Sequence, residues 1–140
     1  MATRREGREA ALQLLYQIEL SGDSSDQAIM DFWLAKGERH PASRAFCEEL
    51  VSRVLTHRQE IDPMIDAAAS NWQLTRIARL DLSLLRLGVC ELLFPRGMAP
   101  AIVINEAVEL ARKYSDGEAS AFVNAVLDRI AYDHGLFVET

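Results

Sequence analysis

Hydrophobic side chains recur along most of this chain at spacings of three and four residues, the period of an α-helix with one buried face. The first such segment ends near Gly22 and begins with Thr3 followed three residues later by Glu6, a capping-box pattern. Its apolar positions are Ala11, Leu14, Leu15 and Ile18. The pattern therefore predicts an N-terminal helix with one face in the core.

The same period predicts six further helices. They begin after the loop 23–26, at about Ser43, at Pro63 behind Asp62 as N-cap, at about Thr75, at about Pro100 and at about Glu118. The helix predicted over residues 75–94 has apolar positions around most of its circumference, which is typical of a central, buried helix. Because alternating apolar runs bounded by tight turns are missing, we predict an all-α fold of seven helices.

The domain organisation follows from length and from one linker. A chain of 140 residues forms one domain. The linker near residue 60 divides it into an N-terminal three-helix half, about residues 1–60, and a C-terminal four-helix half, about residues 61–140. We expect the two halves to pack together.

Composition and charge limit the function. Hydrophobic residues make up 49% and charged residues 26%, which is typical of a folded globular protein. Fifteen basic and 21 acidic side chains give a net charge of −6, so charge alone does not favour coating nucleic acid. Any nucleic-acid contact should therefore be local. Arg4, Arg5 and Arg8 lie within about one helical turn, where guanidinium groups can bind phosphates; the alternative is an exposed helix end whose arginines pair with Glu6 and Glu9.

The chain carries no pattern of a secreted or membrane protein. The first ten residues contain three Arg and two Glu without a following apolar run, so we expect no signal peptide and a cytoplasmic protein. No apolar stretch approaches the length that spans a membrane. Cys47 and Cys90 fall on apolar helix faces; two reduced core thiols are expected, with a disulfide between them as the alternative.

The residues that could carry chemistry do not form an enzyme pattern. The three histidines, His40, His57 and His134, do not pair with Cys, Asp or Glu at metal-ligand spacing. The sequence has no Gly-x-Ser-x-Gly elbow, and its seven glycines are dispersed rather than gathered in a phosphate-binding loop. We therefore predict no catalytic, metal or cofactor site.

Four segments carry a resemblance to a known family. The segments 104–110 and 122–128 resemble both blocks of the C-terminal signature of the NusB family of transcription antitermination factors, at the family's spacing. The segment 84–92 resembles its central helix. The family's N-terminal pattern is matched by Arg4, Arg5, Arg8, Glu9, Ala11, Gln13, Leu15 and Tyr16. The chain departs at Glu6, where a basic residue is frequent, and at Gly7, where Ala is usual; Gly7 should weaken the first helix by roughly 1 kcal/mol relative to Ala.

This resemblance implies a NusB-like, non-enzymatic protein without a cofactor. It would bind boxA-type leader RNA of ribosomal operons together with NusE, a small-subunit ribosomal protein, and support the RNA polymerase antitermination complex. The RNA-binding residues that follow from it are Arg4, Arg5, Arg8, Gln13, Lys113, Tyr114 and Phe122. Those expected at the surface for the protein partner are Tyr16, Glu19, Asp81, Arg86 and Glu91.

Several alternatives stay open at this stage. Phe122 follows the Ser115-Asp116-Gly117 turn, so it is either a core residue or an aromatic platform for an unstacked base. Asn105 and Asn124 are interpreted as amides that cap or cross-link helices. A helical adaptor that has lost RNA binding is one rival function, and a NusB-like accessory domain of an RNA methyltransferase is another, disfavoured by the end of the chain at residue 140 without a cofactor fold. The sequence does not decide between a monomer and a homodimer.

Overall fold

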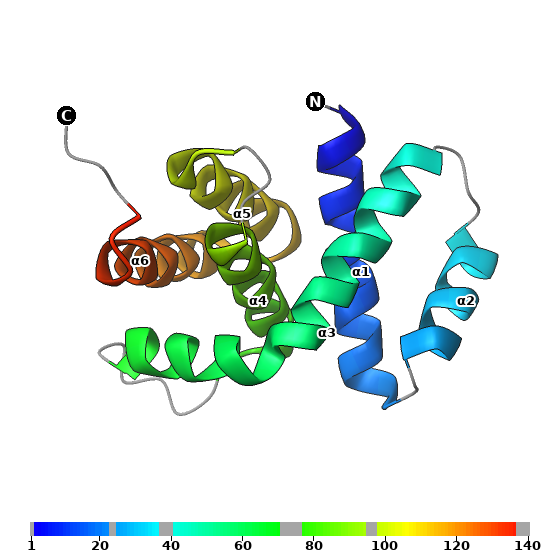
Figure 1. The fold of residues 1–140 in the computed structure, drawn as a ribbon, viewed down its shortest axis with the longest axis horizontal. Helices are drawn as coiled ribbons and strands as arrows, with labels where there is room; N and C mark the ends of the chain where they lie inside the picture. The colour runs from blue at the N-terminus through cyan, green and yellow to red at the C-terminus, as the bar shows by residue number, and fades with distance from the viewer. Residues whose placement is uncertain (1, 23–24, 37–40, 71–76, 95–97, 137–140) are drawn as a thin grey trace.

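Six helices account for almost all of the described chain (Figure 1). The computed structural model describes residues 2–22, 25–36, 41–70, 77–94 and 98–136, and contains no strand within those ranges. The helices are α1 (Ala2–Ser21), α2 (Ser25–Lys36), α3 (Pro41–Ala69), α4 (Arg79–Leu93), α5 (Pro100–Tyr114) and α6 (Gly117–Asp133). The predicted all-α class is confirmed, and the predicted number of seven helices is wrong by one.

The discrepancy lies in α3, which runs without a break through Pro63. Proline inside a helix removes one backbone hydrogen bond and costs about 3 kcal/mol. Ile61 and Ile65 on either side of it are fully buried, and Asp62 is bound by Arg86 of α4, so packing and an ion pair hold the helix together. Asp62 is therefore no N-cap. The domain seam predicted near residue 60 falls inside this helix.

The central position of α4 confirms the prediction made from its apolar circumference. It packs against α1, α3, α5 and α6, and every residue from Ser83 to Leu92 is buried. Gly88 allows the close approach of α6, because a Cβ there would lie 2.7 Å from Leu127 Cδ1. The helix begins later than predicted, at Arg79 rather than Thr75, since residues 77 and 78 are not helical.

The first helix packs along α3, and α2 packs against α1 (Figure 1). Because α1 begins at Ala2, Thr3 lies inside the helix and is not its N-cap. Gly7 is buried at the crossing with α3, where a Cβ would lie 2.6 Å from Phe46 Cδ2 and 3.1 Å from the Ser43 carbonyl oxygen. Gly7 therefore permits close packing of α1 on α3, in addition to its low helix propensity.

The last two helices pack against each other as a hairpin. Pro100 occupies the start of α5, and Asp116 is the N-cap of α6, with its Oδ1 accepting a hydrogen bond of 2.8 Å from the Ala119 amide. This turn places the end of α5 beside α1. The N-terminal helix thereby meets residues about a hundred positions further along the chain.

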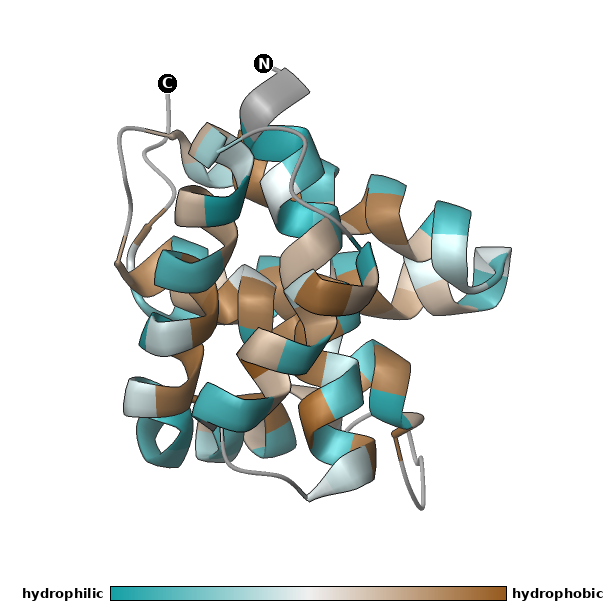
Figure 2. Cartoon of the chain, turned by 90° about the vertical axis from the view of Figure 1, so that its right-hand side faces the viewer, coloured by the Kyte–Doolittle hydropathy of each residue, from teal (hydrophilic) through white to brown (hydrophobic). Residues whose placement is uncertain are grey.

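Buried side chains from all six helices form one core. Figure 2 shows hydrophobic and hydrophilic segments alternating along the helices, as expected of helices with one buried face. Cys47 and Cys90 are buried free thiols, as predicted, and burial raises the pKa of Cys47 to about 12 and that of Cys90 to about 11. No helix of the described residues is both long and apolar enough to cross a membrane.

Candidate nucleic-acid interface

Exposed basic side chains gather where α1 meets α5. Arg4 and Arg5 are exposed on the first turns of α1, and Lys113 is exposed at the end of α5. Arg5 lies 3.3 Å from Glu106 of α5, and Lys113 lies 2.6 Å from Glu9 of α1. The side chains of Lys113 and Arg5 remain 60% and 65% exposed, so each ion pair leaves its cation accessible to solvent. Such cations can exchange a surface carboxylate for a phosphate at little cost.

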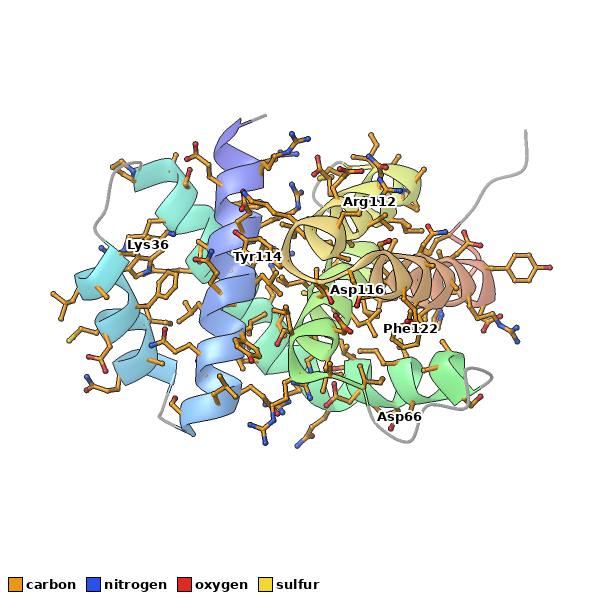
Figure 3. All side chains as sticks on the ribbon, turned by 180° about the vertical axis from the view of Figure 1, so that it is seen from behind. Lys36, Asp66, Arg112, Tyr114, Asp116 and Phe122 are labelled. Atoms are coloured by element: carbon orange, nitrogen blue, oxygen red, sulfur yellow. The ribbon has the colours of Figure 1, made fainter. Side chains whose placement is uncertain are left out.

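A continuous hydrogen-bond network extends this face across α1. Lys36 of α2 donates to Gln13 Oε1 at 3.2 Å, and Gln13 Nε2 donates to the Tyr114 hydroxyl at 3.1 Å. Tyr114 donates to Glu9 Oε1, which also accepts from Lys113. Figure 3 shows Tyr114 beside α1, with Lys36 on the other side of that helix. Three of the predicted RNA residues, Gln13, Lys113 and Tyr114, therefore meet in one network.

The network shifts the pKa values of its members in ways that keep it charged. Partial burial pushes the pKa of Glu9 upward, but hydrogen bonds from Lys113 and Tyr114 outweigh it, and the net shift is downward. The hydrogen bond to Glu9 raises the pKa of Lys113. Burial, together with the Glu9 carboxylate, raises the pKa of Tyr114. At neutral pH the network thus consists of an anionic Glu9, a cationic Lys113 and a neutral Tyr114.

Arg8 does not belong to the exposed basic cluster, so the prediction that placed it there is wrong. Its side chain points inward from α1 and the residue is only 4% exposed. Its Nε lies 2.8 and 3.1 Å from the two carboxylate oxygens of Glu91 on α4, and its Nη2 lies 2.8 Å from Oε2. The guanidinium carbon Cζ lies over the Phe46 ring, 5.4 Å from its centroid. Arg8 therefore joins α1 to the central helix.

Phe122 is a core residue, which decides between the two interpretations left open by its position in the sequence. It is 5% exposed and belongs to the hydrophobic core. Figure 3 places it between α6 and the last turns of α3. A ring buried in this way offers no face to an RNA base, so the expected aromatic platform is not present at Phe122.

A second surface feature is an apolar groove along the C-terminal half of α1. Its volume is about 540 Å³. It is lined by Leu12, Gln13, Tyr16, Gln17, Leu20, Ser21, Leu80 and Tyr114. Tyr16 was predicted to face the protein partner, and its place in this groove keeps it accessible. Gln13 and Tyr114 belong both to the groove and to the hydrogen-bond network.

Two of the other residues predicted for the partner surface are buried in ion pairs. Arg86 donates to both carboxylate oxygens of Asp62, at 2.9 and 3.0 Å, and is 7% exposed. Glu91 is the buried partner of Arg8. The expectation that Arg86 and Glu91 lie at the surface is therefore wrong, and both hold helices together.

Glu19 and Asp81 lie half-buried near the groove. Glu19 accepts from Arg58 at 3.0 Å and from Arg86 at 3.4 Å. Burial raises the pKa of Asp81, opposed by a hydrogen bond from Ser115 and reinforced by the Asp116 carboxylate. One carboxylate oxygen of Asp81 is buried without a hydrogen-bond partner among the described residues. Both side chains retain some exposure, so a docked partner could reach them.

Two members of the network, Lys36 and Glu9, were not predicted from the sequence as RNA-binding residues. Lys36 bonds to a residue 23 positions away, and Glu9 to residues more than a hundred positions away, at sequence separations that no helical spacing encodes. The alternative pairing of the arginines with Glu6 and Glu9 does not hold for Arg5 and Arg8, which pair with carboxylates on α5 and α4. Glu6 accepts from the Ser43 hydroxyl.

The described part of the chain brings no group of three His, Cys, Asp or Glu side chains into a metal-binding arrangement. What the fold and this face define is a small all-α domain whose N-terminal helix displays cations beside an apolar groove. The family model described as the NusB family matches residues 5–132. The chain belongs to the NusB family.

Named relatives match over nearly the whole chain. The transcription antitermination protein NusB of Myxococcus xanthus is 44% identical over 134 residues, covering 94% of this chain and 96% of that protein. The protein of the same name from Geobacter sulfurreducens is 42% identical, covering 94% and 95%. Family membership therefore holds across the whole fold.

Solved structures agree with the sequence relatives. The antitermination factor NusB in a crystal structure with NusE and dsRNA has a TM-score of 0.84 and 30% identity, covering 95% of this chain and 98% of that one. The solution structure of NusB from Aquifex aeolicus has a TM-score of 0.81 and 30% identity, covering 100% and 96%. The helical arrangement described above is thus that of the family.

Proposed function

We propose that this chain is a transcription antitermination factor that binds boxA-type RNA of ribosomal operon leaders together with NusE. It acts by binding, without catalysis, in the cytoplasm and as part of the RNA polymerase antitermination complex. Relatives that share 44% and 42% of their residues with this chain bear the name transcription antitermination protein. A structural neighbour is described with NusE and dsRNA, which supports both kinds of partner.

The observation that carries the proposal is the exposed cationic edge formed by Arg5 and Lys113. Each is held at the α1–α5 boundary by a carboxylate of the other helix, and each remains mostly exposed. Phosphate contacts from Lys and Arg provide most of the affinity of a protein for nucleic acid. On a protein of net charge −6, such a local edge is where RNA would bind.

The contacts revise the set of residues proposed for RNA. It keeps Arg4, Arg5, Gln13, Lys113 and Tyr114 and gains Lys36, whose ammonium group bonds to Gln13. Arg8 and Phe122 leave the set, because both are buried.

The proposed partner surface is the apolar groove on α1 that contains Tyr16, with Glu19 and Asp81 close by. Arg86 contacts Glu19 from the interior, whereas Glu91 is buried against Arg8 and leaves the proposed set. Gln13 and Tyr114 line the groove, and Tyr114 also donates to Glu9, the carboxylate that accepts from Lys113, so NusE would dock directly beside the RNA. RNA and NusE could then touch each other as well as this chain.

A binding titration tests the proposal. We expect weak binding of boxA RNA by this chain alone, because few phosphate contacts oppose the cost of ordering a single strand. Saturating NusE should tighten the RNA at least tenfold, about 1.4 kcal/mol of coupling, and RNA should tighten NusE by the same factor. Equal RNA affinities with and without NusE would contradict joint binding. No RNA binding under either condition would favour the helical adaptor.

A further inference from the structure

A second groove lies on the outer side of the α5–α6 hairpin, away from the cationic edge's contacts with α1. Its volume is about 500 Å³, within the range of roughly 300–1,000 Å³ found for ligand pockets. It is lined by Ala101, Ile104, Asn105, Val108, Arg112, Ser120, Ala121, Asn124 and Asp128. Figure 3 shows the two helices side by side, with Arg112 on α5 and Phe122 on α6. The proposed function assigns no role to this groove.

Two amide side chains face the groove without a structural task. Asn105 and Asn124 are exposed, and neither hydrogen-bonds to another described residue. Ala99 is the N-cap of α5 and Asp116 that of α6, so the interpretation of these amides as caps or cross-links is wrong. Asparagine is a poor residue inside a helix, and here it provides no compensating bond within the protein. Each amide presents one acceptor and two donors to whatever enters the groove.

The groove between the two amides has an apolar floor and a rim of small side chains. Ile104 and Val108 are buried, and Ala101 and Ala121 present only methyl groups at the rim. Small side chains at the rim let a flat ring approach the floor, and amides beside it can reach the ring's edge. An apolar face with hydrogen-bonding groups at the side is the combination by which proteins bind an unstacked RNA base.

The charges around the groove argue for a base rather than a phosphate backbone. Arg112 and Asp128 both line it, so the cation there is balanced by an anion. Arg112 also pairs at 2.6 Å with Glu109, and both side chains are more than half exposed, so this pair exchanges readily. A carboxylate repels phosphate but accepts hydrogen bonds from the amino groups of a base or from a ribose hydroxyl.

We propose that the α5–α6 groove binds a single unstacked base of RNA, with Asn105 and Asn124 bonded to the base edge and Arg112 to the adjoining phosphate. This inference rests on the proposed RNA-binding function and adds to it the recognition of one RNA base. Glu106 and Lys113, which contact α1 at the cationic edge, come from the same helix as Asn105 and Arg112. One strand could therefore run along the edge and leave one base in the groove.

An abasic scan tests the inference. The probes are single-stranded boxA RNA oligonucleotides in which each base in turn is replaced by an abasic site, measured with the full chain and saturating NusE. In the unmodified protein one position should lose about tenfold or more in affinity when its base is missing. Asn124→Ala and Asn105→Ala should each weaken the intact RNA roughly three- to tenfold and should remove most of the penalty at that same position.

Two comparisons separate this inference from the proposed function. Gln27→Ala removes an amide from α2, at the far end of the molecule from α6 (Figure 1), and should change no affinity in the scan. If Arg5→Ala weakens RNA binding while both asparagine variants behave as the unmodified chain, the groove inference fails and the proposed function stands. If the chain binds no RNA at all, both fail.

Equal weakening of every abasic probe, or of duplex and single strand alike, would show that the protein contacts the RNA backbone and would overturn the recognition of a base. Alanine is the better helix former at both positions, so these variants should fold.

Discussion

The guanidinium of Arg8 and the carboxylate of Glu91 form a buried two-point ion pair that joins α1 to the central helix α4, with two contacts of 2.8 Å. These residues lie 83 positions apart in the chain. Met98 Sδ lies 2.7 Å from the same guanidinium, so its surroundings are otherwise weakly polar. The orientation of α1, the helix proposed to bind RNA, thus depends on a buried charge pair.

Breaking this pair should destabilise the fold. We expect Arg8→Ala and Glu91→Ala each to lower the free energy of unfolding by about 3–5 kcal/mol, because each leaves a buried charge without its partner. Urea unfolding followed by circular dichroism measures the loss. Arg8→Met combined with Glu91→Leu should recover most of it, since no charge is then buried alone. Single variants with normal stability and lost RNA binding would instead return Arg8 to the RNA surface.

Removing an exposed cation should act on RNA and leave the fold alone. Arg5→Ala or Lys113→Ala should weaken boxA RNA binding at low salt and reduce the slope of affinity against salt by about 0.7 per lost contact with a single strand. Stability should stay within about 0.5 kcal/mol. Arg129→Ala is the matched control, because Arg129 is an exposed arginine paired to Asp133 four residues along the same helix. An equal effect from the control would mean that only net charge matters.

Truncating Phe122 should reveal its place in the core. Phe122→Ala should lower the free energy of unfolding by about 3–5 kcal/mol. Phe122→Leu keeps most of the buried volume, so it should fold and bind boxA RNA with unchanged affinity. Urea unfolding and RNA titration of the two variants check these outcomes. A stable leucine variant with weakened RNA binding would contradict the core assignment and restore the aromatic platform.

Glu9 should contribute a pH dependence to stability. Its pKa in the folded chain lies below the ordinary value of 4.5, so its contribution is present above that pH and is lost as the pH falls through the folded pKa. In Glu9→Gln this acid-side loss should shrink, by less than about 1 kcal/mol because Lys113, the partner of Glu9, is mostly exposed. Urea unfolding at a series of acid pH values measures it, with Asp66→Asn as an exposed carboxylate control. The variant should also bind RNA more tightly at low salt, since Lys113 is freed; weaker binding would show that Glu9 positions the cation.

Two exposed leucines, one inside the groove on α1 and one outside it, form a matched pair that tests this groove. Leu20 lines the groove and is 52% exposed, whereas Leu34 lies outside it on α2 and is 78% exposed. We expect Leu20→Ala to weaken NusE binding roughly tenfold through lost apolar burial, and Leu34→Ala to leave it unchanged. Neither change should affect RNA binding in the absence of NusE. Calorimetric titration with NusE would contradict the assignment of the groove if Leu34→Ala had the larger effect.

The sequence alone determined the helices whose signals are local. The period of apolar residues, Pro100 at the start of α5 and Asp116 at the start of α6 depend on neighbours within one or two turns, and the structure confirms them. The prediction that a helix begins at Pro63 was wrong for the same reason, since it used only local signals. Its local preference is to begin a helix, but the burial of Ile61 and Ile65 overrides that preference, and no local pattern reports it.

Only the tertiary structure decided which charged and aromatic residues face the solvent. Arg5 and Arg8 are three positions apart and nearly equivalent by pattern, yet Arg5 is mostly exposed and Arg8 is buried against Glu91. Arg5 pairs with a carboxylate on α5, about a hundred positions away in the chain. Arg8 pairs with a carboxylate on α4, 83 positions away. Helical spacing fixes which side of a helix a residue occupies, but what lies opposite that side is set by how the helices pack, because ion pairs and burial depend on distance in space.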